Sequence, residues 1–238
     1  LYLYSPNPNP AKASAPTFKG GGMSLSINYL QQRSSRLVDY FCVVGLEDEI
    51  SLAPNPVSGS IEDGLQVTPL EATYKSVVLD RYPLEDREDV EFFDGVTIFC
   101  FPEGLKLRDQ MQLPTFFTFV QTDVNGDRMY GHVLTFYEPL TETQKTSLDS
   151  IHNAGFSLGQ TSSAPYDYMA PKALCLLSTW PFISEMKEWL SKLYQLSLSA
   201  APLPLERVVQ NLLDDVPCPV AGRTEVLYEW AAGLGGGG

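Results

Sequence analysis

Residues 115–140 read TFFTFVQTDVNGDRMYGHVLTFYEPL and hold two runs rich in β-branched and aromatic residues on either side of Asn125-Gly126. Such runs are typical of β-strands, and Asn-Gly between them is a strong hairpin signal because both residues tolerate positive φ. The competing interpretation is a calcium loop, since Asp-x-Asn-Gly-Asp offers oxygen ligands. Counting from Asp123, however, the twelfth position is Leu134 where a bidentate glutamate is needed, and the glycine falls at the fourth position instead of the sixth. The stretch therefore predicts a β-hairpin.

Three other runs of the same kind predict further strands. They are VDYFCVVG (38–45), VTIFCF (96–101) and ALCLLS (173–178). Residues 46–75 are polar and contain three prolines, so we expect a long loop there. Residues 80–95 concentrate acidic side chains.

Two amphipathic helices are predicted in the later part of the chain. In FISEMKEWLSKLYQLSLS (182–199), Pro181 suits a first turn, and in PLERVVQNLLDDVP (204–217), Pro204 and Pro217 mark the two ends. The apolar positions at helical spacing are Phe182, Met186, Trp189, Leu190, Leu193 and Leu196, then Leu205, Val208, Val209, Leu212 and Leu213. Strands with a hairpin, then a strand and two helices, predict an α/β (α+β) layer sandwich with a mostly antiparallel sheet flanked by helices.

The composition narrows the class of partner. The chain has 16 Lys and Arg against 29 Asp and Glu, a net charge of -13. This balance disfavours binding to nucleic acid and direct electrostatic binding to membranes. Two interpretations of the acidity remain: it attracts basic protein partners, or it only keeps the protein soluble. The acidic run itself is either a solvated loop or a surface for a basic partner; it comprises Glu85, Asp86, Glu88, Asp89, Glu91 and Asp94.

The cysteines predict a reducing compartment. Cys42, Cys100 and Cys175 each lie in an apolar run, where a reduced cysteine behaves as a small hydrophobe, and no two form a C-x-x-C pair. Neither a spanning apolar stretch nor a signal peptide is recognised in the sequence. We therefore expect a cytoplasmic protein.

Motifs for covalent chemistry are weak. Residues 155–159 (GFSLG) match the G-x-S-x-G nucleophile elbow, but no strand precedes Ser157, and both histidines, His132 and His152, lie upstream. His132 sits in a predicted strand and is expected to be a sheet-face residue. No nucleotide, phosphate or zinc motif is present, so no cofactor or metal and no catalytic residue is predicted.

The runs resemble, in their order, the N-terminal part of DENN-domain proteins. The matching stretches are RLVDYFCVVGLE (36–47), VLDRYPLED (78–86), VTIFCFPEGLKL (96–107), the hairpin (115–140), YMAPKALCLLSTWPFISEMKEWLSKLYQL (168–196) and LPLERVVQNLLDDVPCP (203–219). The resemblance implies a guanine nucleotide exchange factor for a Rab GTPase, acting in membrane traffic and reaching vesicle membranes peripherally through the full-length protein. It also implies a longin-like N-terminal lobe, followed in the family by a Rossmann-like lobe, with the GTPase bound between the two.

The resemblance also suggests how the chain is divided. The expected parts are a disordered tail (1–35), the upstream DENN (uDENN) longin-like segment (36–143), a linker that begins helically (144–170), the start of the central DENN segment (171–230) and a Gly-rich tail (231–238). No Rab-binding residue follows from a motif; exposed positions on 182–198 and on the hairpin are the candidate contact surface.

The likeness ends near Trp230, where the rest of the central segment would follow. We therefore expect a fragment or an incomplete gene product that lacks the C-terminal lobe, with Met23 as an alternative start. Two other hypotheses remain open: a non-catalytic longin-like adaptor that binds trafficking proteins, and a hydrolase that uses Ser157.

Overall fold

The computed structural model of the chain describes residues 2–3, 36–53, 68–153, 167–199, 204–219 and 226–227. Its strands are β1 (Tyr2–Leu3), β2 (Tyr40–Leu46), β3 (Ser76–Tyr82), β4 (Thr115–Thr122), β5 (Arg128–Pro139), β6 (Met169–Ser178) and β7 (Val226–Leu227). Its helices are α2 (Val96–Cys100), α3 (Glu142–Asn153), α4 (Ile183–Ser197), α5 (Leu205–Gln210) and the π-helical turn η1 (Asn211–Asp215).

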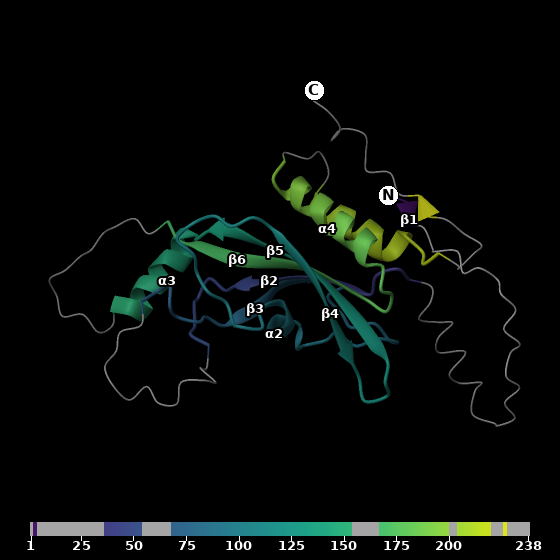
Figure 1. Cartoon of the computed structure of the whole chain (residues 1–238), viewed down its shortest axis with the longest axis horizontal. Helices are drawn as coiled ribbons and strands as arrows, with labels where there is room; N and C mark the ends of the chain where they lie inside the picture. The colour runs from purple at the N-terminus through teal and green to yellow at the C-terminus, as the bar shows by residue number, and fades with distance from the viewer. Residues whose placement is uncertain are drawn as a thin grey trace, which may run out of the picture.

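Within the described residues, five strands form one sheet in the order β3-β2-β6-β5-β4, and every neighbouring pair is antiparallel. Helices α4, α5 and η1 cover one face, while α2 and α3 contribute to the core on the other (Figure 1). β1 and β7 form a separate two-stranded pair. The predicted mixed class with an antiparallel sheet is confirmed.

The central strand, β6, is buried on both faces. Ala173, Cys175 and Leu177 point into the core beneath α2, and Leu174 and Leu176 point towards α4. A strand with both faces covered reads as a continuous apolar run, and ALCLLS is such a run. Its neighbour β2 follows the same alternation, so the two strands join two separate cores.

The predicted hairpin is confirmed. β4 and β5 pair without interruption from Thr115 opposite Thr135 to Thr122 opposite Arg128. In the connecting loop, the Asp123 carboxylate accepts the N–H groups of Asn125, at 2.8 Å, and Asp127, at 2.9 Å. Gly126 adopts φ 87°, a left-handed conformation that favours glycine. The Asn-Gly signal therefore reports a turn.

The prediction of a strand at 96–101 is wrong, because residues 96–100 form helix α2. Val96 and Cys100 are buried one helical turn apart, whereas Ile98 is 67% exposed. In a strand, Ile98 would share a face with both. A six-residue apolar run cannot by itself distinguish a helix from a strand.

Strand β3 was not predicted. It is an edge strand whose residues are half-buried or exposed, so its pattern lacks clean alternation. The helix predicted at 182–199 is confirmed as α4, with Met186, Trp189 and Leu193 in the core. The helix predicted at 204–217 is present as α5, but its last turn widens into η1.

Helix α3 begins the segment predicted as a linker. Residues 154–166 of that segment, with Ser157, and also Met23 and the tail 231–238, lie outside the described residues, whereas the end of the predicted linker, Met169 and Ala170, already belongs to β6. The three predicted core cysteines are confirmed as free and buried. Burial raises the pKa of the Cys175 thiol well above its usual value, so that thiol is a packing group.

Gly131 on β5 provides the first test, since the Phe119 ring lies directly over it. A Cβ built at Gly131 would stand 2.1 Å from Phe119 Cζ. Gly131→Ala is expected to lower the free energy of unfolding by about 1–3 kcal/mol through overpacking. In the Gly131→Ala/Phe119→Ala double variant the loss should be smaller than the sum of the two single losses, measured by urea unfolding. Strict additivity would contradict this packing.

Candidate functional site

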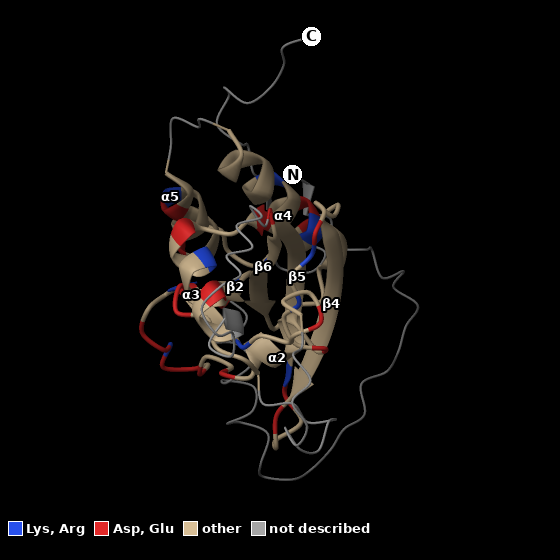
Figure 2. Cartoon of the chain, turned by 90° about the vertical axis from the view of Figure 1, so that its left-hand side faces the viewer, with Lys and Arg blue, Asp and Glu red and all other residues tan. Residues whose placement is uncertain are grey.

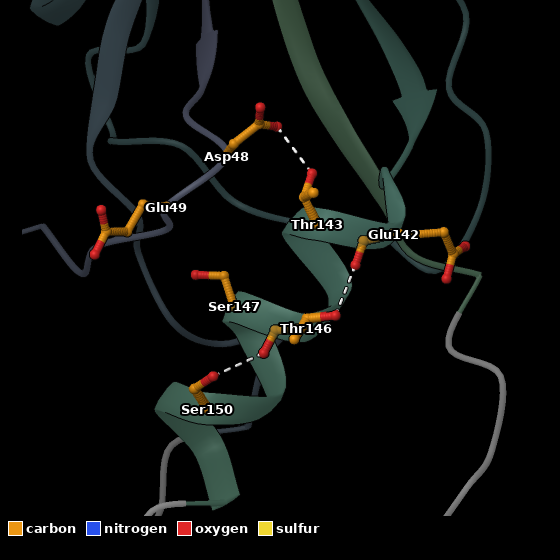
Figure 3. A pocket seen from close by; sticks show the side chains of 7 residues that line it. All are labelled: Asp48, Glu49, Glu142, Thr143, Thr146, Ser147 and Ser150. Atoms are coloured by element: carbon orange, nitrogen blue, oxygen red, sulfur yellow. Dashed lines mark hydrogen bonds between the residues drawn. The ribbon is translucent and has the colours of Figure 1, made fainter.

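An open hollow of about 560 Å³ lies where helix α3 passes the end of β2 (Figure 3). Thr141 and Gln144 cap the helix reciprocally: the Gln144 N–H donates to Thr141 Oγ1, and the Thr141 N–H donates to Gln144 Oε1, both at 3.1 Å. The Gln144 side chain also donates to the Leu46 carbonyl at 3.0 Å. Ser147 Oγ accepts the Ile50 N–H at 2.8 Å. These bonds fix α3 against β2.

The polar groups that line this hollow are largely used within the protein. Thr143 donates to Asp48 at 3.2 Å, and the hydroxyls of Thr146 and Ser150 donate to carbonyls of the preceding helical turn (Figure 3). Glu49 adds an exposed carboxylate. Hydroxyl and carboxylate side chains make up the lining of the hollow.

The acidic run at 85–94 is partly engaged in internal ion pairs. Asp89 binds the Arg36 guanidinium with both carboxylate oxygens, at 2.6 and 2.7 Å. Asp86 pairs with Arg81 at 2.8 Å. Elsewhere Asp and Glu are spread over α3, α5 and the loops (Figure 2). The run therefore has a structural role that the sequence did not reveal.

Arg87, within the same run, connects this loop to the helical layer. Its guanidinium lies 3.5 Å from Asp214 of η1, and Asp214 also accepts the Tyr82 hydroxyl at 2.5 Å. The Arg87 Nε donates to the Asp39 carbonyl at 2.9 Å, and its backbone N–H donates to the Tyr40 hydroxyl at 2.7 Å. The loop after β3 is thereby attached to both β2 and η1.

Asp39 is the one buried carboxylate among the described residues. Its carboxylate accepts hydrogen bonds from the Arg36 guanidinium at 3.3 Å and from the Thr179 N–H at 3.2 Å. These bonds join the start of β2 to the end of β6. Burial raises the pKa of the Asp39 carboxyl, and the Arg36 charge opposes that rise. This is a structural charge pair at the junction of two strands.

Asp89 gives a test of this internal role. Asp89→Asn is expected to lower the free energy of unfolding by about 1–2 kcal/mol, because it weakens a partly buried charged partner whose two carboxylate oxygens both contact Arg36 Nη2. The matched control is Glu88→Gln, an exposed neighbour, which should change it by less than about 0.5 kcal/mol. Equal effects in urea unfolding would mean that the pair contributes nothing to stability.

His132 is confirmed as a sheet-face residue. It is fully buried on β5, on the α4 side of the sheet, with Nδ1 3.3 Å from the Thr118 hydroxyl oxygen. Burial lowers its pKa to about 4, so the imidazole is neutral near pH 7. His152 is placed in α3, and the described residues contain no group of three His, Cys, Asp or Glu side chains arranged to hold a metal ion.

The depressed pKa of His132 makes stability depend on pH. Between the unfolded value of 6.5 and the folded value of about 4, the unfolded chain binds the proton and the folded chain does not, so stability falls as pH falls. Relative to His132→Gln, the wild type should lose about 2–3 kcal/mol between pH 7 and pH 4.5. Urea titrations at both pH values measure this; a constant difference between the two proteins would contradict it.

Two surfaces remain outside these networks. On α4 the side chains of Lys187, Glu188 and Lys192 are exposed, and Lys187 lies 5.9 Å from the centre of the Phe116 ring. At the hairpin tip, Val124 is fully exposed. They belong to residues 182–198 and to the hairpin, the two segments whose exposed positions are the candidate contact surface.

Two protein-family models match parts of the chain. A family model of the uDENN domain matches residues 76–136, and one of the DENN (AEX-3) domain matches residues 169–234. The chain is a DENN-domain protein. The resemblance inferred from the sequence is therefore confirmed. No solved structure matches the chain.

The two matched segments of this DENN-domain protein interleave in space. The uDENN match supplies β3, α2, β4 and most of β5, and the DENN match supplies β6, α4, α5 and η1. Because β6 lies between β2 and β5, the two segments share one sheet. DENN domains are in general exchange modules for Rab GTPases. In the described part of the chain, no helix is long and apolar enough to cross a membrane.

Proposed function

We propose that this chain is the N-terminal lobe, or a fragment, of a guanine nucleotide exchange factor that promotes GDP release from a Rab GTPase in membrane traffic. The observation that carries the proposal is the presence of both uDENN and DENN segments in one sheet. In this proposal residues 36–143 are the uDENN longin-like segment and residues 171–230 begin the central DENN segment. The protein would act in the cytoplasm and peripherally on vesicle membranes.

The proposed mechanism needs no nucleophile. An exchange factor binds the nucleotide-free GTPase more tightly than the loaded one and displaces the switch segments that hold Mg²⁺ and phosphate. In the hollow beside α3, the bonds of Gln144 and Ser147 hold that helix against β2 and the residues after it. We expect the GTPase to bind the exposed side chains of α4 and of the hairpin tip. Both elements are anchored to the sheet by their buried side chains.

The first experiment measures release of a fluorescent GDP analogue from a panel of Rab GTPases. The chain is added alone and, in parallel, as a longer version that includes the remaining central and downstream DENN segments. Acceleration by both means that one lobe suffices, and acceleration by the longer version alone identifies a fragment of an exchange factor. Binding without acceleration by either would replace the proposal with the adaptor hypothesis.

A charge reversal tests the nominated surface. Lys192→Glu on α4 is expected to slow exchange at least about 5-fold, roughly the 1 kcal/mol of a lost interfacial charge contact, without altering stability. The matched control is Lys75→Glu, an exposed lysine before β3, which should leave the rate unchanged. Equal rates for both variants and the wild type would exclude Lys192 from the contact.

A further inference from the structure

Among the described residues, strand β4 forms one edge of the sheet and pairs only with β5. The Asp123 N–H donates to the Asp127 carbonyl at 2.9 Å, and the hydrogen-bonded pairs of an antiparallel ladder recur at every second residue. Odd-numbered residues of β4 therefore bond to β5. The backbone N–H and C=O groups of the even-numbered residues face outwards; these are Phe116, Thr118, Val120 and Thr122. No described residue bonds to these outward groups.

This edge lacks the features that usually prevent edge-to-edge pairing. Natural edge strands carry charges, prolines or bulges. β4 (TFFTFVQT) has no charged residue and no proline, and its register with β5 is unbroken over eight residues. The opposite edge, β3, differs: it carries Asp80 and Arg81, and its pairing with β2 shifts between Val43 and Val44.

An apolar surface borders the same edge on the α2 side of the sheet. The Phe119 ring lies 4.8 Å from that of Phe99 and 6.4 Å from that of Phe93, measured between centroids. Ile98 is 67% exposed and Phe99 is 38% exposed. The neutral backbone edge and this apolar surface are thus continuous.

We propose that β4 pairs antiparallel with β4 of a second copy of this chain. The register that uses every outward group sets Phe116 opposite Thr122 of the other copy, and Thr118 opposite Val120. Its two-fold axis then passes through Phe119. In this register the four outward N–H groups of each chain all donate across the junction.

The side chains favour a second copy over an unrelated strand. Residue 119 of each copy faces its own symmetry mate at a non-hydrogen-bonded position, where Cα atoms approach to about 4.5 Å. The partly exposed apolar surfaces of Ile98 and Phe99 in the two copies then border the same face of the extended sheet. Phe117 faces Gln121, so no like charges are opposed within the ladder. The long-range repulsion of two chains of net charge -13 opposes the pairing, as does the entropy cost of association, and salt screens the repulsion.

This inference does not depend on the exchange activity. The two-fold axis stands perpendicular to the sheet, because both copies of Phe119 lie on the same face. Both α2 helices therefore lie on one side of the extended sheet, and both α4 helices lie on the other, with their outer faces still exposed.

Analytical ultracentrifugation in 0.5 M NaCl tests the pairing. The wild-type chain should sediment with twice its monomer mass of 26.3 kDa at tens of micromolar. Val120→Pro removes an outward N–H while retaining the bonds to β5, and should give a folded monomer whose melting temperature is close to that of the wild type at concentrations too low for pairing. Val120→Thr keeps the N–H and should remain dimeric. A monomeric wild type, or a Val120→Pro dimer, would overturn the proposal.

Disulfide trapping tests the register independently of stability. In a Cys218→Ser background, Phe119→Cys places two thiols on the axis, and treatment with diamide should yield a covalent dimer. Gln121→Cys is the matched control, since residues 121 of the two copies would lie about 13 Å apart, four residues along the strand. Trapping by Gln121→Cys and not by Phe119→Cys would overturn the register and with it the proposal.

Discussion

The insertion of β6 between β2 and β5 is the constraint on which the rest of the structure depends. Before β6 joins, β2–β3 and the β4–β5 hairpin are two separate antiparallel pairs with no strand in common. Cys42 and Cys175 oppose each other across the completed sheet, so the closing contacts join residues far apart in sequence. Such contacts are formed only after a long loop has closed. The uDENN and DENN segments therefore contribute strands to one sheet.

Burial on both faces of β6 also determines what kind of function the molecule can support. Leu176 and Leu177, adjacent in sequence, belong to different cores, so the interior is filled with side chains. Some of the described charges fasten elements to one another, as with Asp39 at the β2–β6 junction and Asp214 on η1. A protein organised in this way offers surfaces for recognition, in agreement with the role of DENN modules in binding GTPases.

Sequence patterns predicted the elements whose local and tertiary preferences agree. The Asn-Gly hairpin, the apolar run of β6 and the stripe of α4 each combine a clear period with full burial. The strand prediction at residues 96–101 was wrong because β-branched and aromatic residues favour a strand. Within the helix that forms there, the core accepts only Val96 and Cys100, one helical turn apart. The role of Asp89 could not be predicted either, because Arg36, its partner, lies 53 residues away in the sequence. Strand β3 was not predicted for a different reason. An edge strand buries few side chains, so its sequence shows little alternation of apolar and polar residues.

The neutral edge of β4 is unusual in so acidic a chain, and its placement bears on recognition. If two copies join through β4, the symmetry axis sets both α4 helices on the same side of a continuous sheet. GTPases held on one membrane could then engage both α4 faces, and the second contact would form at the effective concentration set by the first. This combination rests on both proposals and gives each a physical reason: α4 keeps its outer charges because it meets a partner, and β4 lacks charges because it meets itself.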